Sequence, residues 1–249
     1  MVKILGKQIG YGALMILACL ALAIFLTVNS VWLFEINIQP LKLTAATGLT
    51  ASQMHHDYVR IIEYLQLPWI SSLKLHYFFS SAKGLQHFRD VKGLILFNNF
   101  VGLVLVPVGA YLLHRLNKKS LTWLLMTPIK VVTTVSLVII ALMLVNFEQV
   151  FVAFHEVLFR NQDWIFDPNT DPVINMLPDT FFLECFLLFF ILFFGGLAVI
   201  YRLGRKSLKG INYSGSFIKI QSNRYAMIPG KNGVNAKMTN TNLDKVGFH

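Results

Sequence analysis

Long apolar stretches alternate with polar segments along this chain. Uncharged or nearly uncharged runs cover about residues 11–34, 93–113, 131–152 and 181–201. A helix needs about 20 apolar residues to cross the roughly 30 Å hydrocarbon core of a bilayer. We therefore predict an all-α membrane protein with four transmembrane helices in a single domain over 1–210.

The segments between these runs also carry helical signals. In the 35–92 loop, MHHDYVRIIEYLQLP places Tyr58, Ile61 and Leu65 at helical spacing, after an N-cap at Thr50 or Ser52 and before a stop at Pro68. A second piece, FFSSAKGLQHFRDVKGL, leads directly into the second run. We expect helical or interfacial segments in both long loops. Residues 211–249 are rich in Asn, Lys, Gly, Ser and Thr, which favours a disordered tail.

Charge sets the expected orientation. The net charge is +10, and the basic residues gather before residue 11, in 114–130 and after Tyr201, whereas the acids gather in 148–184. The positive-inside rule then puts both termini in the cytoplasm and the two long loops outside. No basic stripe interleaved with exposed aromatic residues is present, so we expect no nucleic-acid partner.

Two histidines stand beside the apolar runs, where the outer membrane interface would lie. His87 precedes the second run and His155 follows the third. Histidine is the usual general base near neutral pH. On a helix, Lys83 and Asp90 share the face of His87, and a carboxylate there could fix its tautomer. The alternative for each is a solvated interfacial histidine.

Other polar residues suggest supporting roles. Asn98 and Asn99, in the second run, could donate hydrogen bonds to an ester oxygen or join helices. Further candidates for substrate binding in the acidic loop are Arg160, Asp163, Trp164 and Asp167. The zinc-protease pattern HExxH is absent, as are GxSxG, phosphate-loop, dinucleotide and CxxC motifs. We predict no metal or cofactor, and we interpret Cys19 and Cys185 as packing residues.

Two segments resemble a known family. QHFRDVKGL (86–94) and FHEVLFRNQDWIFDPNTDPVINMLPDTFF (154–182), together with the four apolar runs, are similar to the lipoprotein intramolecular transacylase (Lit) family of Gram-positive bacteria. The resemblance covers about residues 10–205. It implies an acyltransferase of the bacterial cell membrane that moves the sn-2 acyl chain of a diacylglyceryl-cysteine lipoprotein to the α-amino group of the same cysteine.

The resemblance also implies that His87 and His155 are the catalytic residues, at the extracellular face. The expected partners are diacylated lipoproteins and membrane lipid, and we expect a monomer. The roles of the two histidines as base and as hydrogen-bond donor remain open at this point. Two other hypotheses are a non-catalytic lipid-binding or assembly protein with four spans, and a metal-dependent membrane hydrolase.

Overall fold

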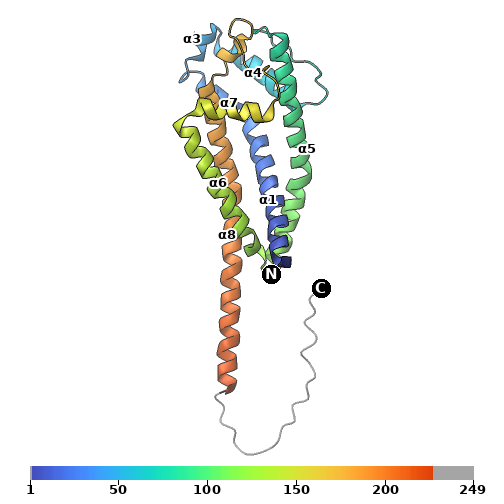
Figure 1. The fold of residues 1–249 in the computed structure, drawn as a ribbon, viewed down its shortest axis with the longest axis vertical. Helices are drawn as coiled ribbons and strands as arrows, with labels where there is room; N and C mark the ends of the chain where they lie inside the picture. Colours follow the sequence, from blue (N-terminus) through green and yellow to red (C-terminus); the bar gives the residue numbers. More distant parts are fainter. Residues whose placement is uncertain (1, 227–249) are drawn as a thin grey trace, which may run out of the picture. The chain divides into compact units, whose positions relative to one another are not determined.

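The computed structural model describes residues 2–226, with side chains described from 4 to 209, and its regular secondary structure in that range consists of helices alone (Figure 1). The chain divides into two units, Met1–Leu208 and Lys209–His249, and the fold below is that of the first. Its elements are α1 (Val2–Val28), α2 (Val31–Asn37), α3 (Leu43–Thr47), α4 (Ala51–Gln66), α5 (Ala82–Lys118), η1 (Thr122–Leu125), α6 (Met126–Val145), α7 (Phe147–Leu158), η2 (Pro172–Asn175) and α8 (Asp179–Ala226).

Four helices are long and apolar enough to cross a membrane, as predicted. They cover Ile4–Val28, Ala82–Lys118, Thr122–Val145 and Asp179–Lys209. Large apolar side chains on them, including Phe97, Leu103, Leu142 and Ile191, are exposed. A soluble protein rarely leaves so much apolar surface uncovered, so these faces suit contact with lipid.

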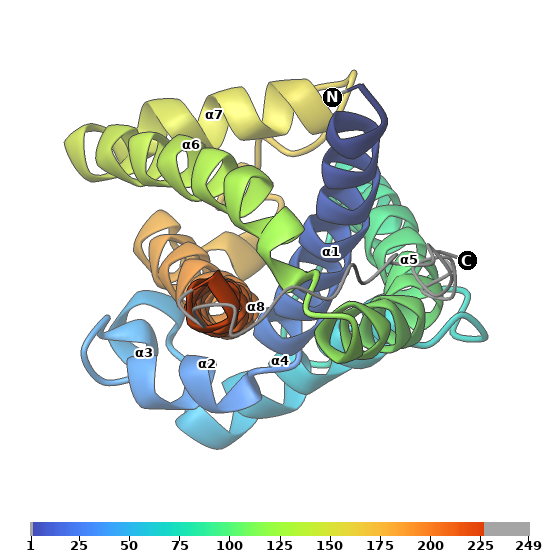
Figure 2. The same ribbon diagram turned by 90° about the horizontal axis from the view of Figure 1, so that it is seen from below.

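Helix α1 packs between α5 and α6, as the view along the bundle shows (Figure 2). Close packing depends on small residues. A Cβ on Gly12 of α1 would lie 2.5 Å from Cγ of Pro128 at the start of α6. The side chain of Asn98 on α5 donates to the carbonyl of Ala21 on α1, 3.2 Å away. A cluster around Met15, Leu125 and Phe193 forms the core of this part.

Two helix boundaries differ from the prediction. The first apolar run does not form one helix to residue 34, because Asn29 and Ser30 bond back to the last carbonyls of α1 and α2 starts at Val31. The third helix does not reach residue 152. It ends at Val145, and the backbone of Asn146 is extended. The side chain of Asn146 accepts from the backbone N–H of Gln149 and so caps the start of α7.

The expected tail also differs. Helix α8 continues to Ala226, so residues 211–226, where we predicted disorder, are helical. The rest of the predicted tail, 227–249, lies outside the described residues.

The helices α2, α3, α4 and α7 gather at one end of the long helices, away from the N-terminus (Figure 1). A second core holds this end together, with the rings of Phe34 and Tyr58 stacked 4.1 Å apart and Phe181 of α8 against both. Helix α4 starts at Ala51, and its N-cap is Thr50, one of the two predicted N-caps, which forms a capping box with Gln53. We call this assembly the cap.

Candidate active site

The two histidines that flank the apolar runs meet between α7 of the cap and the start of α5. His87, on the second turn of α5, and His155, near the end of α7, have ring centroids 5.9 Å apart. No hydrogen bond joins the two rings directly within the described residues. His155 is buried and His87 is half-buried. The separation leaves both imidazoles within reach of one small group.

Aromatic side chains enclose the pair. The ring of Phe159 lies 4.9 Å from that of His87 and 5.8 Å from that of His155. Phe166 lies edge-on to His87 at 5.5 Å, and Trp164 stacks on His155 at 4.9 Å with an interplanar angle of 30°. These walls restrict water around the imidazoles, which strengthens electrostatic interactions with a bound group.

Hydrogen bonding distinguishes the two rings. Nδ1 of His155 lies 2.7 Å from the carbonyl oxygen of Phe151, one turn earlier on α7. A carbonyl can only accept, so Nδ1 carries the proton and Nε2 of the neutral ring keeps its lone pair. Nδ1 of His87 is buried without a partner among the described residues. An unpaired buried polar atom costs about 1–3 kcal/mol, which a bound oxygen could recover.

The environment of His155 favours the neutral ring. Burial lowers the pKa of His155 below its ordinary value, and the hydrogen bond to the Phe151 carbonyl offsets only part of this effect. At neutral pH the imidazole is therefore a base with a free lone pair.

A clamp between α5 and η2 positions His87. The buried carboxylate of Asp171 accepts from the backbone N–H of Ser81 at 2.8 Å and from its hydroxyl at 2.7 Å. The Ser81 hydroxyl also accepts from the N–H of Gly84 and so caps α5. A Cβ on Gly84 would lie 2.2 Å from Oδ1 of Asp171, so only glycine allows this contact.

Asp90 does not bond to His87, contrary to the proposed tautomer-fixing role. Its two carboxylate oxygens accept from the side-chain amides of Gln86, at 2.7 Å, and Asn161, at 2.9 Å. One turn after His87 on the helix, Asp90 instead faces the loop that follows α7. Lys83 is exposed, and no hydrogen bond or ion pair links its side chain to any described residue.

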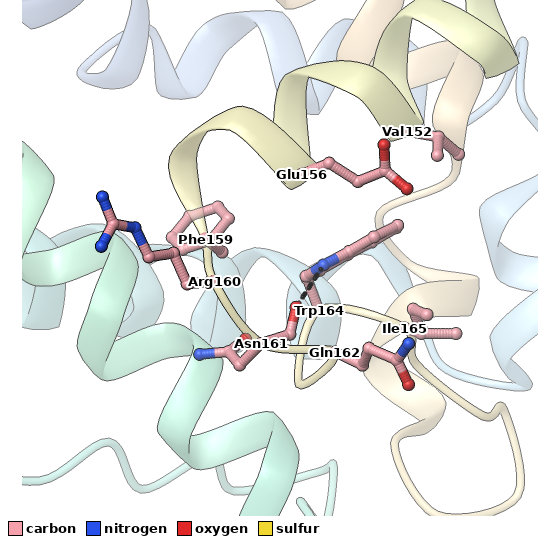
Figure 3. Close-up of a pocket in the computed structure, with 8 residues that line it drawn as sticks. All are labelled: Val152, Glu156, Phe159, Arg160, Asn161, Gln162, Trp164 and Ile165. Atoms are coloured by element: carbon pink, nitrogen blue, oxygen red, sulfur yellow. Dashed lines mark hydrogen bonds between the residues drawn. The ribbon is translucent and has the colours of Figure 1, made fainter.

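The remaining predicted site residues divide into those near the pair and those away from it. Arg160 and Trp164 line a cavity of about 560 Å³ beside α7 (Figure 3). A second cavity, of about 440 Å³, lies between α5 and the end of α7 and is lined in part by Asp90, Gly93 and Arg160. Phe159 lines both cavities and also contacts the rings of His87 and His155.

The two asparagines of α5 act between helices. Asn98 bonds to α1, as described above, and Asn99 donates to the side-chain oxygen of Gln66 at the end of α4. Asp167 stabilises a turn by accepting from Asn169. Asp163 contributes only its backbone N–H, which donates to Asn161. None of these four residues hydrogen-bonds to either imidazole in the described part of the chain.

Three important residues escaped the sequence analysis as site residues: Phe159, Asn161 and Asp171. Phe159 carries no polar signal, and the partners of Asn161 and Asp171 lie far away in sequence. The acid-rich turn FDPNTDP contains Asp171 but does not indicate which of its acids is buried. No group of three or more metal-ligating side chains occurs among the described residues.

The comparisons with known proteins agree with this architecture. Residues 9–182 match the family model described as lipoprotein intramolecular transacylase Lit. A structure of the membrane-integral lipoprotein intramolecular transacylase Lit from Bacillus cereus is 29% identical, with a TM-score of 0.71, covering 83% of this chain and 96% of that one.

Two further structures of the Bacillus cereus protein carry a histidine mutation. The histidine-to-arginine mutant is 27% identical with a TM-score of 0.69, covering 83% of this chain and 92% of the other. The histidine-to-alanine mutant is 26% identical with the same TM-score, covering 83% and 94%. A search of curated proteins found no match. Because the family model covers most of the chain, this protein belongs to the lipoprotein intramolecular transacylase Lit family.

Proposed function

We propose that this protein moves the sn-2 acyl chain of a diacylglyceryl-cysteine lipoprotein to the α-amino group of the same cysteine. The observation that carries the proposal is the pair of imidazoles, 5.9 Å apart, enclosed by aromatic rings. Family membership supplies the reaction class, and the pair supplies the groups that the reaction needs.

In this proposal His155 is the general base. Its Nδ1–H is held by the Phe151 carbonyl, so the lone pair on Nε2 accepts a proton from the attacking amine. The amine nitrogen forms a bond to the ester carbonyl carbon, and the bond from that carbon to the sn-2 oxygen breaks. The protonated His155 then returns the proton to the departing alkoxide, so no proton is gained or lost.

His87 stabilises the negative charge on the ester oxygen. Its Nδ1 is buried and has no partner in the described part of the chain, so a substrate oxygen can complete its hydrogen bonding. Neutral histidine is a donor at one ring nitrogen, and the role requires the proton on the nitrogen that faces the substrate. The amine and the ester belong to one molecule, which removes the entropic cost of bringing them together.

The proposed surroundings follow from the same features. The substrate approaches through the cavity between α5 and α7, where Gly93 and Leu94 lead toward the exposed apolar face of α5. The distribution of basic residues supports an active site at the extracellular face and cytoplasmic termini. Both imidazoles belong to one chain, which supports a monomer as the active species.

The test is expression in a bacterial strain whose lipoproteins are purely diacylated, followed by mass spectrometry of the lipoprotein N-termini. The unmodified protein should produce N-acylated lyso-form lipopeptides. The substitutions His87→Ala and His155→Ala should each abolish this product at equal protein abundance. His55→Ala is the matched control, because His55 pairs with Glu35 at the exposed surface of the cap. Full activity of either site mutant would refute the mechanism.

A further inference from the structure

The loop that follows α7 packs on α5 through the rings of Phe159 and Phe166, and one residue, Asn161, hydrogen-bonds it to that helix. The loop runs from Phe159 to Phe166 without helix, and it carries the three rings that enclose the histidines: Phe159, Trp164 and Phe166. Within the described residues, the hydrogen bond from the Asn161 side chain to Asp90 is the one that joins this loop to α5.

Asn161 makes three interactions at once. Its side-chain amide donates to Oδ2 of Asp90 at 2.9 Å, and its side-chain oxygen accepts from the backbone N–H of Asp163 at 3.1 Å. Its backbone carbonyl accepts from the indole N–H of Trp164 at 3.0 Å, as Figure 3 shows. One residue therefore anchors the loop to α5, shapes its turn and holds the Trp164 ring.

Trp164 links Asn161 to His155, the proposed general base. The indole stacks on the ring of His155, which also contacts Phe159. At the other end of the chain of contacts, the Asp90 carboxylate is fixed by Gln86, immediately before His87 on α5. The network thus begins beside one catalytic histidine and ends against the other.

We propose that Asn161 is a positioning residue that sets the relative placement of the two imidazoles by coupling the loop after α7 to α5 through Asp90. The proposal rests on the transacylase function proposed above. Asn161 does not touch either imidazole in this network. Its effect passes through Trp164 on one side and Asp90 on the other.

Exchange of the two side chains provides a sharp test. Asn161→Asp keeps the oxygen that accepts from Asp163 but places a carboxylate against that of Asp90, so the two repel. The double substitution Asp90→Asn with Asn161→Asp restores one amide and one carboxylate, with donor and acceptor reversed. Rescue by the double variant is expected only when the bond itself matters.

The measurement is steady-state kinetics on a purified diacylated lipopeptide in detergent micelles, with thermal unfolding followed in parallel. Asn161→Asp should lower kcat by roughly tenfold to a hundredfold, a range typical of misplaced catalytic groups, with little change in KM and in the unfolding temperature. The double variant should recover most of kcat. Asn169→Ala is the control, because Asn169 lies in the next turn of the chain and its hydrogen bonds within the described residues go to the exposed Asp167.

The outcomes separate two failures. An unmodified protein that forms no N-acylated product contradicts the proposed function itself. An active unmodified protein whose Asn161→Asp variant keeps full kcat overturns the positioning role. Loss of kcat that follows a fall in unfolding temperature, or that the double variant does not reverse, also overturns it.

Discussion

At the scale of single residues, the site assigns different chemistry to two side chains of the same type. His155 has one nitrogen engaged by a backbone carbonyl, whereas Nδ1 of His87 is buried without a partner in the described part of the chain. The first arrangement frees a lone pair and suits a base. The second creates a hydrogen-bonding deficit that a substrate oxygen can relieve. The enclosing rings of Phe159 and Trp164 make both effects stronger by limiting water.

The environment of His155 predicts a pH dependence. Burial lowers its pKa, so the neutral form persists below the ordinary value of 6.5, and protonation removes the lone pair only at still lower pH. We expect the acidic limb of the kcat/KM profile to lie below pH 6.5. Trp164→Ala exposes the ring to water and should move that limb upward. His87, whose ring lies 5.9 Å away, and Glu156, the next residue in the chain, are kept unchanged in the comparison.

The profile is measured on residual activity with the same lipopeptide. Trp164→Phe keeps an aromatic ring against His155 and serves as the control, with a limb close to that of the unmodified protein. A limb that stays in place in Trp164→Ala would show that solvent exclusion by Trp164 does not set the titration.

At the scale of secondary structure, the start of α5 determines where His87 lies. The Asp171 carboxylate binds the N-cap residue Ser81. It also lies so close to Gly84 that a Cβ at that position would collide with it. The clamp ties α5 to η2, which lies immediately before α8 along the chain. One buried acid therefore holds the first turn of the helix that carries His87.

This packing predicts opposite effects for two glycines on α5. Gly84→Ala places a methyl group 2.2 Å from Asp171 Oδ1 and should destabilise the protein by about 1–3 kcal/mol, because the buried carboxylate must move. Gly93→Ala meets nothing within 4 Å and should stabilise the helix slightly, by less than about 1 kcal/mol. Thermal unfolding in detergent measures both. A Gly84→Ala variant as stable as Gly93→Ala would contradict the clamp.

At the scale of the whole molecule, four apolar helices carry a cap whose core is separate from that of the bundle. His155 lies in the cap and His87 lies beside it at the start of α5, whereas basic residues lie in the last turn at the opposite end of α5. The candidate active-site histidine of α5 and the basic residues that indicate membrane topology therefore lie at opposite ends of that helix. The positive-inside rule then relates the active site to one side of the membrane.

Cysteine labelling tests the orientation in intact cells. With Cys19 and Cys185 replaced by serine, Asn169→Cys in the exposed turn of the cap should react with a membrane-impermeant maleimide. Lys119→Cys, at the end of α5, should react only after the cells are permeabilised. Labelling of Lys119→Cys alone in intact cells would reverse the proposed orientation.

The sequence by itself determined the features that depend on local composition. Runs of apolar residues identified the four long helices, because a bilayer requires about 20 such residues in succession whatever their partners. The capped start of α4 followed from a short pattern as well. The resemblance to the family rested on two sequence segments, 86–94 and 154–182, and the match to the family model confirmed it.

Only the tertiary structure decided which distant side chains meet. Asp90 was expected beside His87 because they share a helix face, yet its carboxylate bonds to Asn161 across the site. The third apolar run breaks at Asn146, and the resulting turn brings His155 on α7 to face His87. The hydrophobic pattern of a sequence indicates which residues are buried away from water, whereas the pairing of buried polar groups depends on the three-dimensional arrangement of the chain.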